Sequence, residues 1–490
     1  MAAEIYDFII IGAGLSGIDA AYRLKTELPH CSFTILEARD KIGGTWSFFK
    51  FPGLRSDSQL TCFGFPWYPW LNKKDIADAG LILDYVESAA EDEGIDQKIQ
   101  FQHKATAADW STEEQLWVLK INERDVESQE KTYKATFILN CTGYYDYEKP
   151  LQTTIAGLEN FGGVVAHPQF WPEELDYSGK RVVLIGSGAT AVTLLPVLAE
   201  QASHVTMLQR SPSYVFSIPS VNPVGTFLKT RLPVWLAHLL NWWRSFLLEQ
   251  AFVQLNLRFP NAARKLHMYL MRKQLPASVS VDVHFNPRYA PMEQRLCLCP
   301  DGDFFKALHR DNCDIVTDEI KTVSKEGILT YSGVKLDADI IVTATGLHVE
   351  LLSGIRPTVD GKSIDIATEY AWRGCMISGV PNMGAVMGYT TSSWTLGADA
   401  CIKLLISVYK HMKNVGATSA VPVFDGDETR SKPVVQHSST YFMNARDRLP
   451  RITGESPWYG RISPMYDTWQ LWFGDLTKGM KYSIREKKDN

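Results

Sequence analysis

The sequence lacks paired cysteines. Its 490 residues include 8 cysteines, and none of them forms a Cys-x-x-Cys motif. The closest two, Cys297 and Cys299, are too close together for the common zinc patterns. Scattered cysteines in a long chain are typical of buried free thiols in a reducing compartment. The spacing therefore argues against a metal site and against a dithiol redox centre, such as that of a pyridine-nucleotide disulfide reductase.

Long apolar runs and a strong charge bias are also missing. The apolar run at residues 8–11 has the length of a strand, far short of the roughly 20 residues that span a bilayer. A formal net charge of -5 excludes a general binder of nucleic acid. Because Glu4 and Asp7 stand where a secretory signal would carry basic residues, we expect a cytoplasmic protein. The length itself predicts two or three domains.

The N-terminal segment shows a strand–turn–helix–strand pattern. A β-rich run at residues 7–11 leads into Gly-x-Gly-x-x-Gly at residues 12–17. A helical pattern follows to Leu28, and a second strand at residues 32–36 ends at Glu37. A glycine turn, a helix and an acidic residue about 20 positions later make up the dinucleotide-binding βαβ unit.

Each position of this unit has a physical task. Gly12 makes the tight turn, Gly14 lets the backbone approach a pyrophosphate, and Gly17 lets helix and strand pack closely. The helix N-terminus offers free N–H groups to the phosphates, and Glu37 can accept hydrogen bonds from a ribose diol. A glycine turn without a ligand is the alternative, but all five parts of the unit occur in order.

A second copy of the unit lies far downstream. A strand at residues 181–185 is followed by Gly186 and Gly188, and the third glycine position holds Ala191, a permitted variant. After a helix toward Gln201, the next strand ends at Arg210 and Ser211.

The two units carry opposite charges at the same architectural place. Glu37 lies 25 positions after Gly12, and Arg210 lies 24 positions after Gly186. A carboxylate there repels a 2′-phosphate, whereas an arginine can hold one through paired charge-assisted hydrogen bonds. The first unit is therefore predicted to take a nucleotide with a free ribose, and the second to take NADPH. An ordinary surface arginine is the alternative for Arg210.

A motif just before the second unit carries a family resemblance. Phe161, Gly163, His167, Trp171 and Pro172 match Phe-x-Gly-x-x-x-His-x-x-x-Trp-Pro at every fixed place. The chain thereby resembles the class B flavoprotein monooxygenases, and among them the Baeyer–Villiger monooxygenases. Further segments, at residues 43–46, 51–57, 294–297 and 388–394, are similar to the ethionamide-activating branch.

The resemblance implies FAD and NADPH as cofactors and a ketone or a sulfide as the small-molecule substrate, together with O2. Reduced flavin would form a peroxide at its C4a carbon, which inserts one oxygen atom into a ketone to give an ester or a lactone. The alternative is oxidation of an N or S atom by the same peroxide. A non-catalytic NADPH sensor is the remaining alternative, although one nucleotide unit would suffice for sensing.

The resemblance also assigns residue roles. Arg295 holds the position of the catalytic arginine and Asp57 that of its acidic partner, while Gly44, Thr45 and Trp46 would lie against the flavin. Many relatives have a basic residue where this chain has Gln294, which leaves Arg210 with more of the contact to the 2′-phosphate. The His167 motif would couple the two nucleotide units.

Trp394 has two interpretations. It could line the substrate or nicotinamide pocket, or it could be a core tryptophan.

Residues 225–275 stand apart by charge. They hold eight basic residues against Glu249 alone, with Trp235, Trp242 and Trp243 among leucines and phenylalanines. A basic amphipathic helix with tryptophans can lie on an anionic membrane. We favour a helical lid over the active site, with peripheral membrane contact as the alternative.

The predicted fold class is α/β, with two Rossmann-like dinucleotide-binding domains, for FAD and NADPH, and a helical insert. The expected boundaries are residues 1–150 and 346–490 for the FAD domain, 151–214 and 282–345 for the NADPH domain, and 215–281 for the insert.

Overall fold

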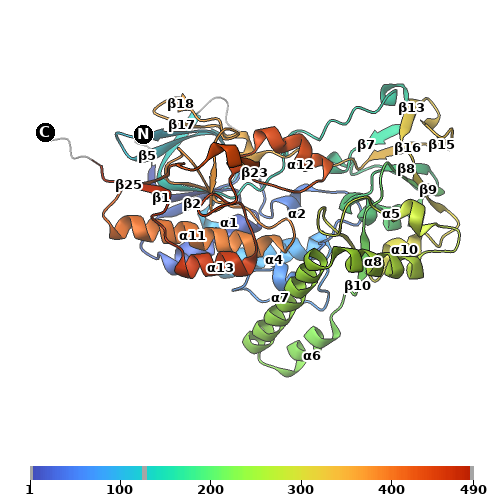
Figure 1. Cartoon of the computed structure of the whole chain (residues 1–490), viewed down its shortest axis with the longest axis horizontal. Coiled ribbons are helices and arrows are strands. Elements are labelled where there is room, and N and C mark those ends of the chain that lie inside the picture. Colours follow the sequence, from blue (N-terminus) through green and yellow to red (C-terminus); the bar gives the residue numbers. More distant parts are fainter. Residues whose placement is uncertain (1–3, 124–129, 486–490) are drawn as a thin grey trace.

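The protein is represented by a computed structural model that describes residues 4–123 and 130–485 (Figure 1). Two sheets lie side by side along the longest axis. The first takes its strands from residues 4–140 and 357–385, and the second takes them from residues 164–343. Within the described residues, no helix is both long and apolar enough to cross a membrane.

The larger sheet has 11 strands in the order β18-β17-β4-β5-β6-β1-β2-β3, and β21 joins it beside β6. Its members are β1 (Glu4–Ile11), β2 (Phe33–Leu36), β3 (Ile99–Gln100), β4 (His103–Ser111), β5 (Leu116–Glu123), β6 (Glu130–Asn140), β17 (Pro357–Val359), β18 (Lys362–Ser363), β19 (Ala371–Trp372), β20 (Met376–Ile377) and β21 (Met383–Ala385). Strands β3, β2, β1, β6 and β21 run parallel. Residues 8–11 are buried on both faces, which is why the strand is an unbroken apolar run rather than an alternating one.

The second sheet is parallel throughout, in the order β12-β9-β8-β16-β7. Its strands are β7 (Val164–Ala166), β8 (Arg181–Ile185), β9 (His204–Gln209), β12 (Cys313–Thr317) and β16 (Ile340–Thr343). Around both sheets lie the pairs β10 (Val215–Ile218) and β11 (Cys297–Pro300), β22 (Ser419–Pro422) and β25 (Met480–Ser483), β23 (Lys432–Pro433) and β24 (Arg451–Ile452), and the trio β13 (Ile320–Ser324), β14 (Gly327–Thr330) and β15 (Lys335–Asp337).

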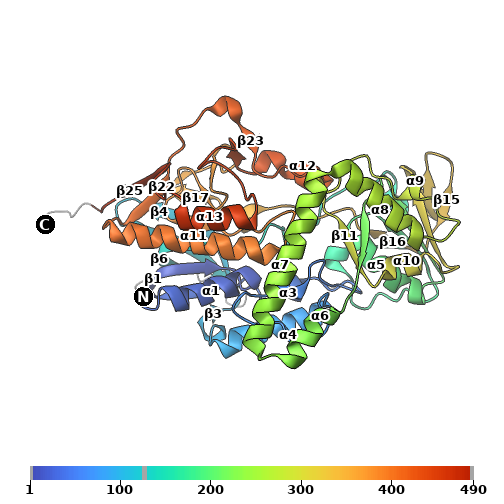
Figure 2. The same cartoon turned by 60° about the horizontal axis from the view of Figure 1, so that its bottom comes forward.

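Helices cover the sheets and build one projection. They are α1 (Leu15–Glu27), α2 (Thr45–Phe48), α3 (Leu60–Phe63), α4 (Ala79–Asp92), α5 (Ala189–Gln201), α6 (Pro223–Arg231), α7 (Val234–Arg258), α8 (Pro260–Gln274), α9 (Val281–His284), α10 (Asp303–Ala307), α11 (Trp394–Asn414), α12 (Thr440–Ala445) and α13 (Pro464–Phe473). Helix α7 crosses in front of the region between the two sheets, and α6 lies beside its outer end (Figure 2).

The strands predicted at both glycine turns are present as β1, β2, β8 and β9. The segment predicted as a helical insert, residues 215–281, differs at its start, because β10 occupies residues 215–218 before the helices begin. This short strand pairs in parallel with β11, about 80 residues away, and so distant a partner is not visible in a local pattern.

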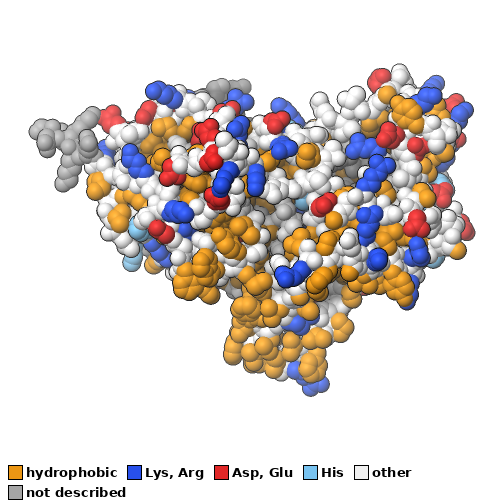
Figure 3. Space-filling view, in the orientation of Figure 1, with side chains coloured by type: hydrophobic (Ala, Val, Ile, Leu, Met, Phe, Trp, Pro, Cys, Tyr) orange, Lys and Arg blue, Asp and Glu red, His pale blue; other side chains and the backbone are white. Residues whose placement is uncertain are grey.

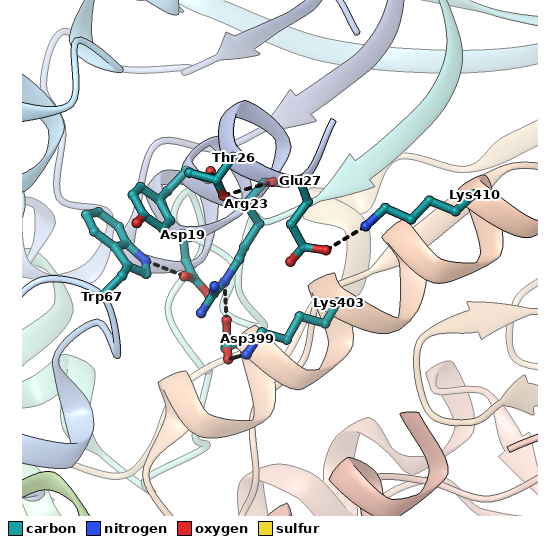
Figure 4. A network of polar contacts seen from close by, with 9 residues as sticks. Asp19, Arg23, Thr26, Glu27, Trp67, Asp399, Lys403 and Lys410 are labelled. Atoms are coloured by element: carbon teal, nitrogen blue, oxygen red, sulfur yellow. Dashed lines mark hydrogen bonds and ion pairs between the residues drawn. The ribbon is translucent and has the colours of Figure 1, made fainter. Parts of the chain in front are cut away.

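A buried charge network fixes α11 against α1 (Figure 4). Nε of Arg23 donates to Oδ1 of Asp399 at 2.7 Å, and Nζ of Lys403 lies 2.7 Å from the other oxygen. The indole N–H of Trp67 donates to Oδ1 of Asp19 at 2.8 Å, while Oδ2 of Asp19 has no hydrogen-bond partner among the described residues. Burial, followed by the Asp399 charge, raises the pKa of Asp19 to about 7.

This raised pKa predicts a pH-dependent stability. Between pH 3.8 and about 7 the native state holds a proton on Asp19 that the unfolded chain has lost. The free energy of unfolding therefore contains a component that falls as the pH rises through this window. Asp19→Asn cannot titrate, and we expect it to remove that component. The thermal midpoint of the variant, relative to the native protein, should rise by about 2 °C or more between pH 5 and pH 8.

Glu27→Gln is the matched control. It removes the more exposed Glu27–Lys410 pair between the same two helices, so it should change the midpoint little at any pH. Parallel pH profiles for Asp19→Asn and the native protein would contradict the assignment.

Candidate functional site

A cavity of about 720 Å³ lies between the two nucleotide-binding units. Its walls come from the β1–α1 turn, from residues 43–57, from the segment after β6, and from the first turn of α5. Arg295 and Trp394 complete the lining. The volume falls in the range of small-molecule and cofactor sites.

The first glycine turn has the close contacts that a dinucleotide cradle requires. Gly12 has φ +102, and a Cβ there would lie 2.9 Å from the carbonyl oxygen of Cys141. A Cβ at Gly17 would lie only 1.9 Å from the carbonyl oxygen of Gly12. Gly14 faces Gly44, since a Cβ on Gly14 would be 3.4 Å from the Cα of Gly44. These glycines let backbone form the cavity wall at the N-terminus of α1.

Glu37 lies at the end of β2, on the wall of the same cavity. It is 5% exposed, and its Oε2 accepts from the backbone N–H of Ala13 at 2.8 Å. Its Oε1 accepts from the backbone N–H of Arg39 at 3.0 Å. The guanidinium of Arg39 also donates to the carbonyl of Gly44 at 3.0 Å. The turn, the acid and the Gly44 segment are thus tied together by hydrogen bonds.

Thr45 and Trp46 follow Gly44 in the cavity wall. The hydroxyl of Thr45 lies 3.0 Å from that of Tyr147, and Trp46 packs edge-on against Phe63. Residues 44–46 therefore lie directly beside the first glycine turn, and these contacts fix the side chains of Thr45 and Trp46.

The second glycine turn approaches the cavity from another side. A Cβ on Gly186 would lie 2.3 Å from the carbonyl oxygen of Ala344, whereas Gly188 has open space beside it. Ala191, in the first turn of α5, is fully buried, so its methyl group is accommodated. Neither glycine lines the 720 Å³ cavity, but the next two residues of α5 do.

Arg210 and Ser211 lie at the exposed end of β9. The carbonyl oxygen of Ser211 accepts from the hydroxyl of Ser187 at 2.9 Å, which joins this strand end to the second glycine turn. The arginine is thus placed beside the turn, as a 2′-phosphate contact requires.

Arg295 and Asp57 form a two-pronged ion pair in the cavity. Nε of Arg295 lies 2.9 Å from Oδ2 of Asp57, and Nη2 donates to Oδ1 at 3.0 Å. The carboxylate is the main cause that raises the pKa of Arg295 above its ordinary value. The ion pair orients the guanidinium. Because 37% of the arginine side chain is exposed, a ligand can still reach it.

Two tyrosines beside Arg295 were not foreseen. The hydroxyls of Tyr144 and Tyr145 lie 2.6 Å apart, and burial raises the pKa of both. Tyr144 stacks on Trp394 with ring centroids 5.0 Å apart, and the indole N–H of Trp394 donates to Ser16 at 3.1 Å. Trp394 is thus both packed and part of the cavity lining. The only sequence signal for the two tyrosines is their place shortly after the apolar run of residues 137–139.

The segment from Phe161 to Pro172 includes β7, at the edge of the second sheet. A Cβ on Gly163 would lie 2.2 Å from the carbonyl oxygen of Asp339, so only glycine fits there. Nδ1 of His167 accepts from the backbone N–H of Gln169 at 3.2 Å, and burial lowers the pKa of this histidine. His167 thus caps a turn through Nδ1, while its buried Nε2 has no hydrogen-bond partner among the described residues.

The same segment touches the first nucleotide unit. The side-chain amide of Gln169 donates to the carbonyl of Asp146, a cavity residue, at 2.6 Å. Trp171 is buried in one core with Phe49 and Phe51, which belong to the N-terminal part of the chain. Packing thus joins the two halves at this segment.

None of the eight cysteines forms a disulfide. All eight are free, and burial raises the pKa of Cys297, the one nearest Arg295, to about 12. A thiol with such a pKa is protonated at neutral pH and is a poor nucleophile.

The chain matches known proteins over most of its length. The model of the flavin-binding monooxygenase-like family matches residues 7–279. The FAD-containing monooxygenase EthA of Mycolicibacterium smegmatis is 42% identical over 465 residues, which cover 95% of this chain and 94% of the relative. EthA of Mycobacterium tuberculosis is 41% identical over 456 residues, which cover 93% of each chain.

Solved structures share the fold. A steroid monooxygenase bound to NADP has a TM-score of 0.75 at 19% identity and covers 98% of this chain and 100% of its own. An open structure of cyclohexanone monooxygenase has a TM-score of 0.74 at 18% identity, with the same coverage. The predicted α/β fold and the predicted class of flavoprotein monooxygenase are confirmed. The chain belongs to the flavin-binding monooxygenase-like family.

Proposed function

We propose that this protein uses FAD, NADPH and O2 to insert one oxygen atom into a ketone, giving an ester or a lactone. The observation that carries the proposal is the Arg295–Asp57 pair, which fixes a permanent positive charge in the wall of a cofactor-sized cavity. The heteroatom oxygenation of a sulfide or amine is the competing reaction.

The first nucleotide unit suits FAD. Gly12, Gly14 and Gly44 line the cavity with backbone beside the N-terminus of α1, where a pyrophosphate would bind, and the buried carboxylate of Glu37 suits a ribose without a 2′-phosphate. Thr45 and Trp46 would flank the flavin ring from the opposite wall. Bound FAD, once reduced, supplies the activation of oxygen, and the protein supplies position and charge.

The second unit suits NADPH. The open space at Gly188 and the free N–H groups of α5 favour a pyrophosphate, and Arg210 with Ser211 favours the 2′-phosphate. We place the FAD domain at residues 1–150 and 346–490 and the NADPH domain at residues 151–214 and 282–345. The segment from Phe161 to Pro172 would couple them, since it contacts both.

Arg295 would stabilise negative charge on the reacting oxygen and would not transfer a proton. A guanidinium stays protonated in a protein, so it can stabilise negative charge on oxygen without neutralising it. An anionic oxygen attacks a carbonyl carbon, whereas a protonated one oxidises sulfur or nitrogen. Asp57 engages Nε and Nη2, and part of the arginine side chain stays exposed in the cavity wall, where a ligand can reach it. A fixed charge of this kind favours the ketone reaction.

The direct test is product analysis. The purified holoenzyme is given NADPH, air and an equimolar mixture of a cyclic ketone and an alkyl aryl sulfide. Lactone as the main product supports the proposal, and sulfoxide as the only product overturns it in favour of heteroatom oxygenation.

Arg295→Ala separates oxygen insertion from NADPH oxidation. We expect ester formation to fall by about 100-fold or more, because a fixed electrostatic contact to the reacting oxygen is lost. NADPH consumption should continue and should release hydrogen peroxide, which a peroxidase-coupled assay measures. Arg310→Ala is the control, because it removes an exposed arginine that does not line the cavity. Undiminished ester formation in Arg295→Ala would remove this residue from the mechanism.

Arg210→Gln tests the assignment of NADPH to the second unit. Loss of a charge-assisted contact worth about 1.5–3 kcal/mol should raise the KM for NADPH by roughly 10- to 100-fold. The KM for NADH, which has no 2′-phosphate, should change little. Steady-state oxygen uptake with each nucleotide measures both values. Equal effects on the two nucleotides would show that Arg210 does not read the 2′-phosphate.

A further inference from the structure

The buried side of helix α7 is rich in polar residues. It holds Asn241, Ser245, Gln250 and Asn256 together with the apolar residues Ala237, Phe246 and Val253. Asn241 donates to the carbonyl of Gly225 at 3.2 Å, and Gln250 donates to the hydroxyl of Ser392 at 3.2 Å. A surface helix of a water-soluble protein normally turns its apolar stripe to the core. Helix α7 instead turns polar residues inward and exposes most of its large apolar residues.

The outward side of the same helix is apolar. Trp235, Trp243 and Leu247 are exposed by 68%, 49% and 57%, and they follow one another at four- and eight-residue spacing along one stripe. Other large apolar side chains exposed on α6, α7 and the α7–α8 junction are Val224, Phe227, Val234, Leu239, Leu240, Leu248, Leu255, Leu257 and Phe259. So large a contiguous patch is rarely left to water and marks an interaction site.

A second group of exposed apolar side chains lies on α13. Trp469, Trp472 and Phe473 are exposed by 52%, 71% and 69%. In Figure 3, apolar side chains cover the lower projection made by α6 and α7 and gather again to its left, over the region of α13. The two groups together form the apolar face.

The charges around the projection have one sign. Arg231, Arg258, Lys265 and Lys273 are exposed on α6 to α8, and Arg272, also exposed, pairs with Asp282 at 3.2 Å. The only acid on these three helices, Glu249, is turned inward and accepts hydrogen bonds from the backbone N–H and the hydroxyl of Ser393 at 2.9 and 2.8 Å. The surface of the projection is therefore apolar and positive.

We propose that the apolar face docks on an anionic lipid bilayer. Exposed tryptophans and leucines can enter the boundary between headgroups and acyl chains, while flanking lysines and arginines contact anionic headgroups. A second copy of this chain fits less well, because a symmetric contact would set two positive projections against each other. No α helix among the described residues spans a membrane, so the contact is peripheral.

Docking would bring the bilayer close to the cavity. Glu249 and Gln250 on the inner side of α7 hold Ser393 and Ser392, which directly precede Trp394 in the cavity wall. Helix α7 thus carries part of the apolar face on its outer side and holds the loop before Trp394 on its inner side.

The test uses the full-length holoenzyme and sedimentation with vesicles. At low salt, the native protein should sediment with phosphatidylglycerol–phosphatidylcholine vesicles and much less with phosphatidylcholine alone. The variant Trp235→Gln/Trp243→Gln/Leu247→Gln should lose at least tenfold in vesicle affinity. The control Ile5→Gln/Tyr331→Gln/Val415→Gln changes side chains of similar exposure outside the apolar face and should bind as the native protein does.

Fold and function are controlled separately. Bound flavin, measured by its absorbance, shows that each variant is folded, and the binding readout does not depend on oxygenase activity. Absence of native binding to anionic vesicles at low salt, or unchanged binding of the triple variant, overturns the proposal. Sedimentation velocity without lipid completes the test: a dimer that only the apolar-face variant dissociates, with no vesicle binding, would assign the face to a second copy.

Discussion

The contact on which the candidate site depends is the ion pair of Arg295 with Asp57. The two residues lie 238 positions apart in the sequence, and the pair closes the cavity between the two nucleotide units. Both carboxylate oxygens are engaged, so the guanidinium plane is fixed. A partly buried arginine without this carboxylate would be costly, and a carboxylate without the arginine would leave an unpaired negative charge in the cavity wall. The pair therefore sets both the stability and the sign of charge of the site.

Around this pair, packing keeps the two units in register. Phe49 and Phe51 of the N-terminal part share a core with Trp171 and with the strands of the second sheet. Gln169 adds a hydrogen bond to the carbonyl of Asp146, in the segment that follows β6. A hydride donor on one unit and its acceptor on the other need a constant separation, and a shared aromatic core supplies it better than exposed polar contacts would.

The polar residues on the inner side of α7 are explained by the groups that this side contacts. Its inner side meets loops, whose backbone groups and hydroxyls need hydrogen-bond partners, and asparagine, glutamine and serine provide them. Ala237, Phe246 and Val253 pack inward with them, while most of the large apolar residues of the helix are exposed, where a nonaqueous surface or another protein can cover them. The inner side of α7 therefore holds the loop that precedes Trp394, and its outer side contributes to the apolar face.

The sequence by itself determined the local units of this protein. The glycine turns, their flanking strands and the opposite charges of Glu37 and Arg210 follow from short-range chemistry, because tight turns and buried parallel strands restrict which residues can occupy them. The Arg295–Asp57 partnership could be named only through family resemblance, and Tyr144 and Tyr145 beside it were missed. Their role depends on the approach of segments hundreds of positions apart, which no local pattern encodes. Only the tertiary structure decided that β10 precedes the helices of the insert, that Trp394 lies in the cavity wall, and which side of α7 faces outward. Helical periodicity shows that a helix has two faces, but it is the packing of the rest of the chain that decides which one is buried.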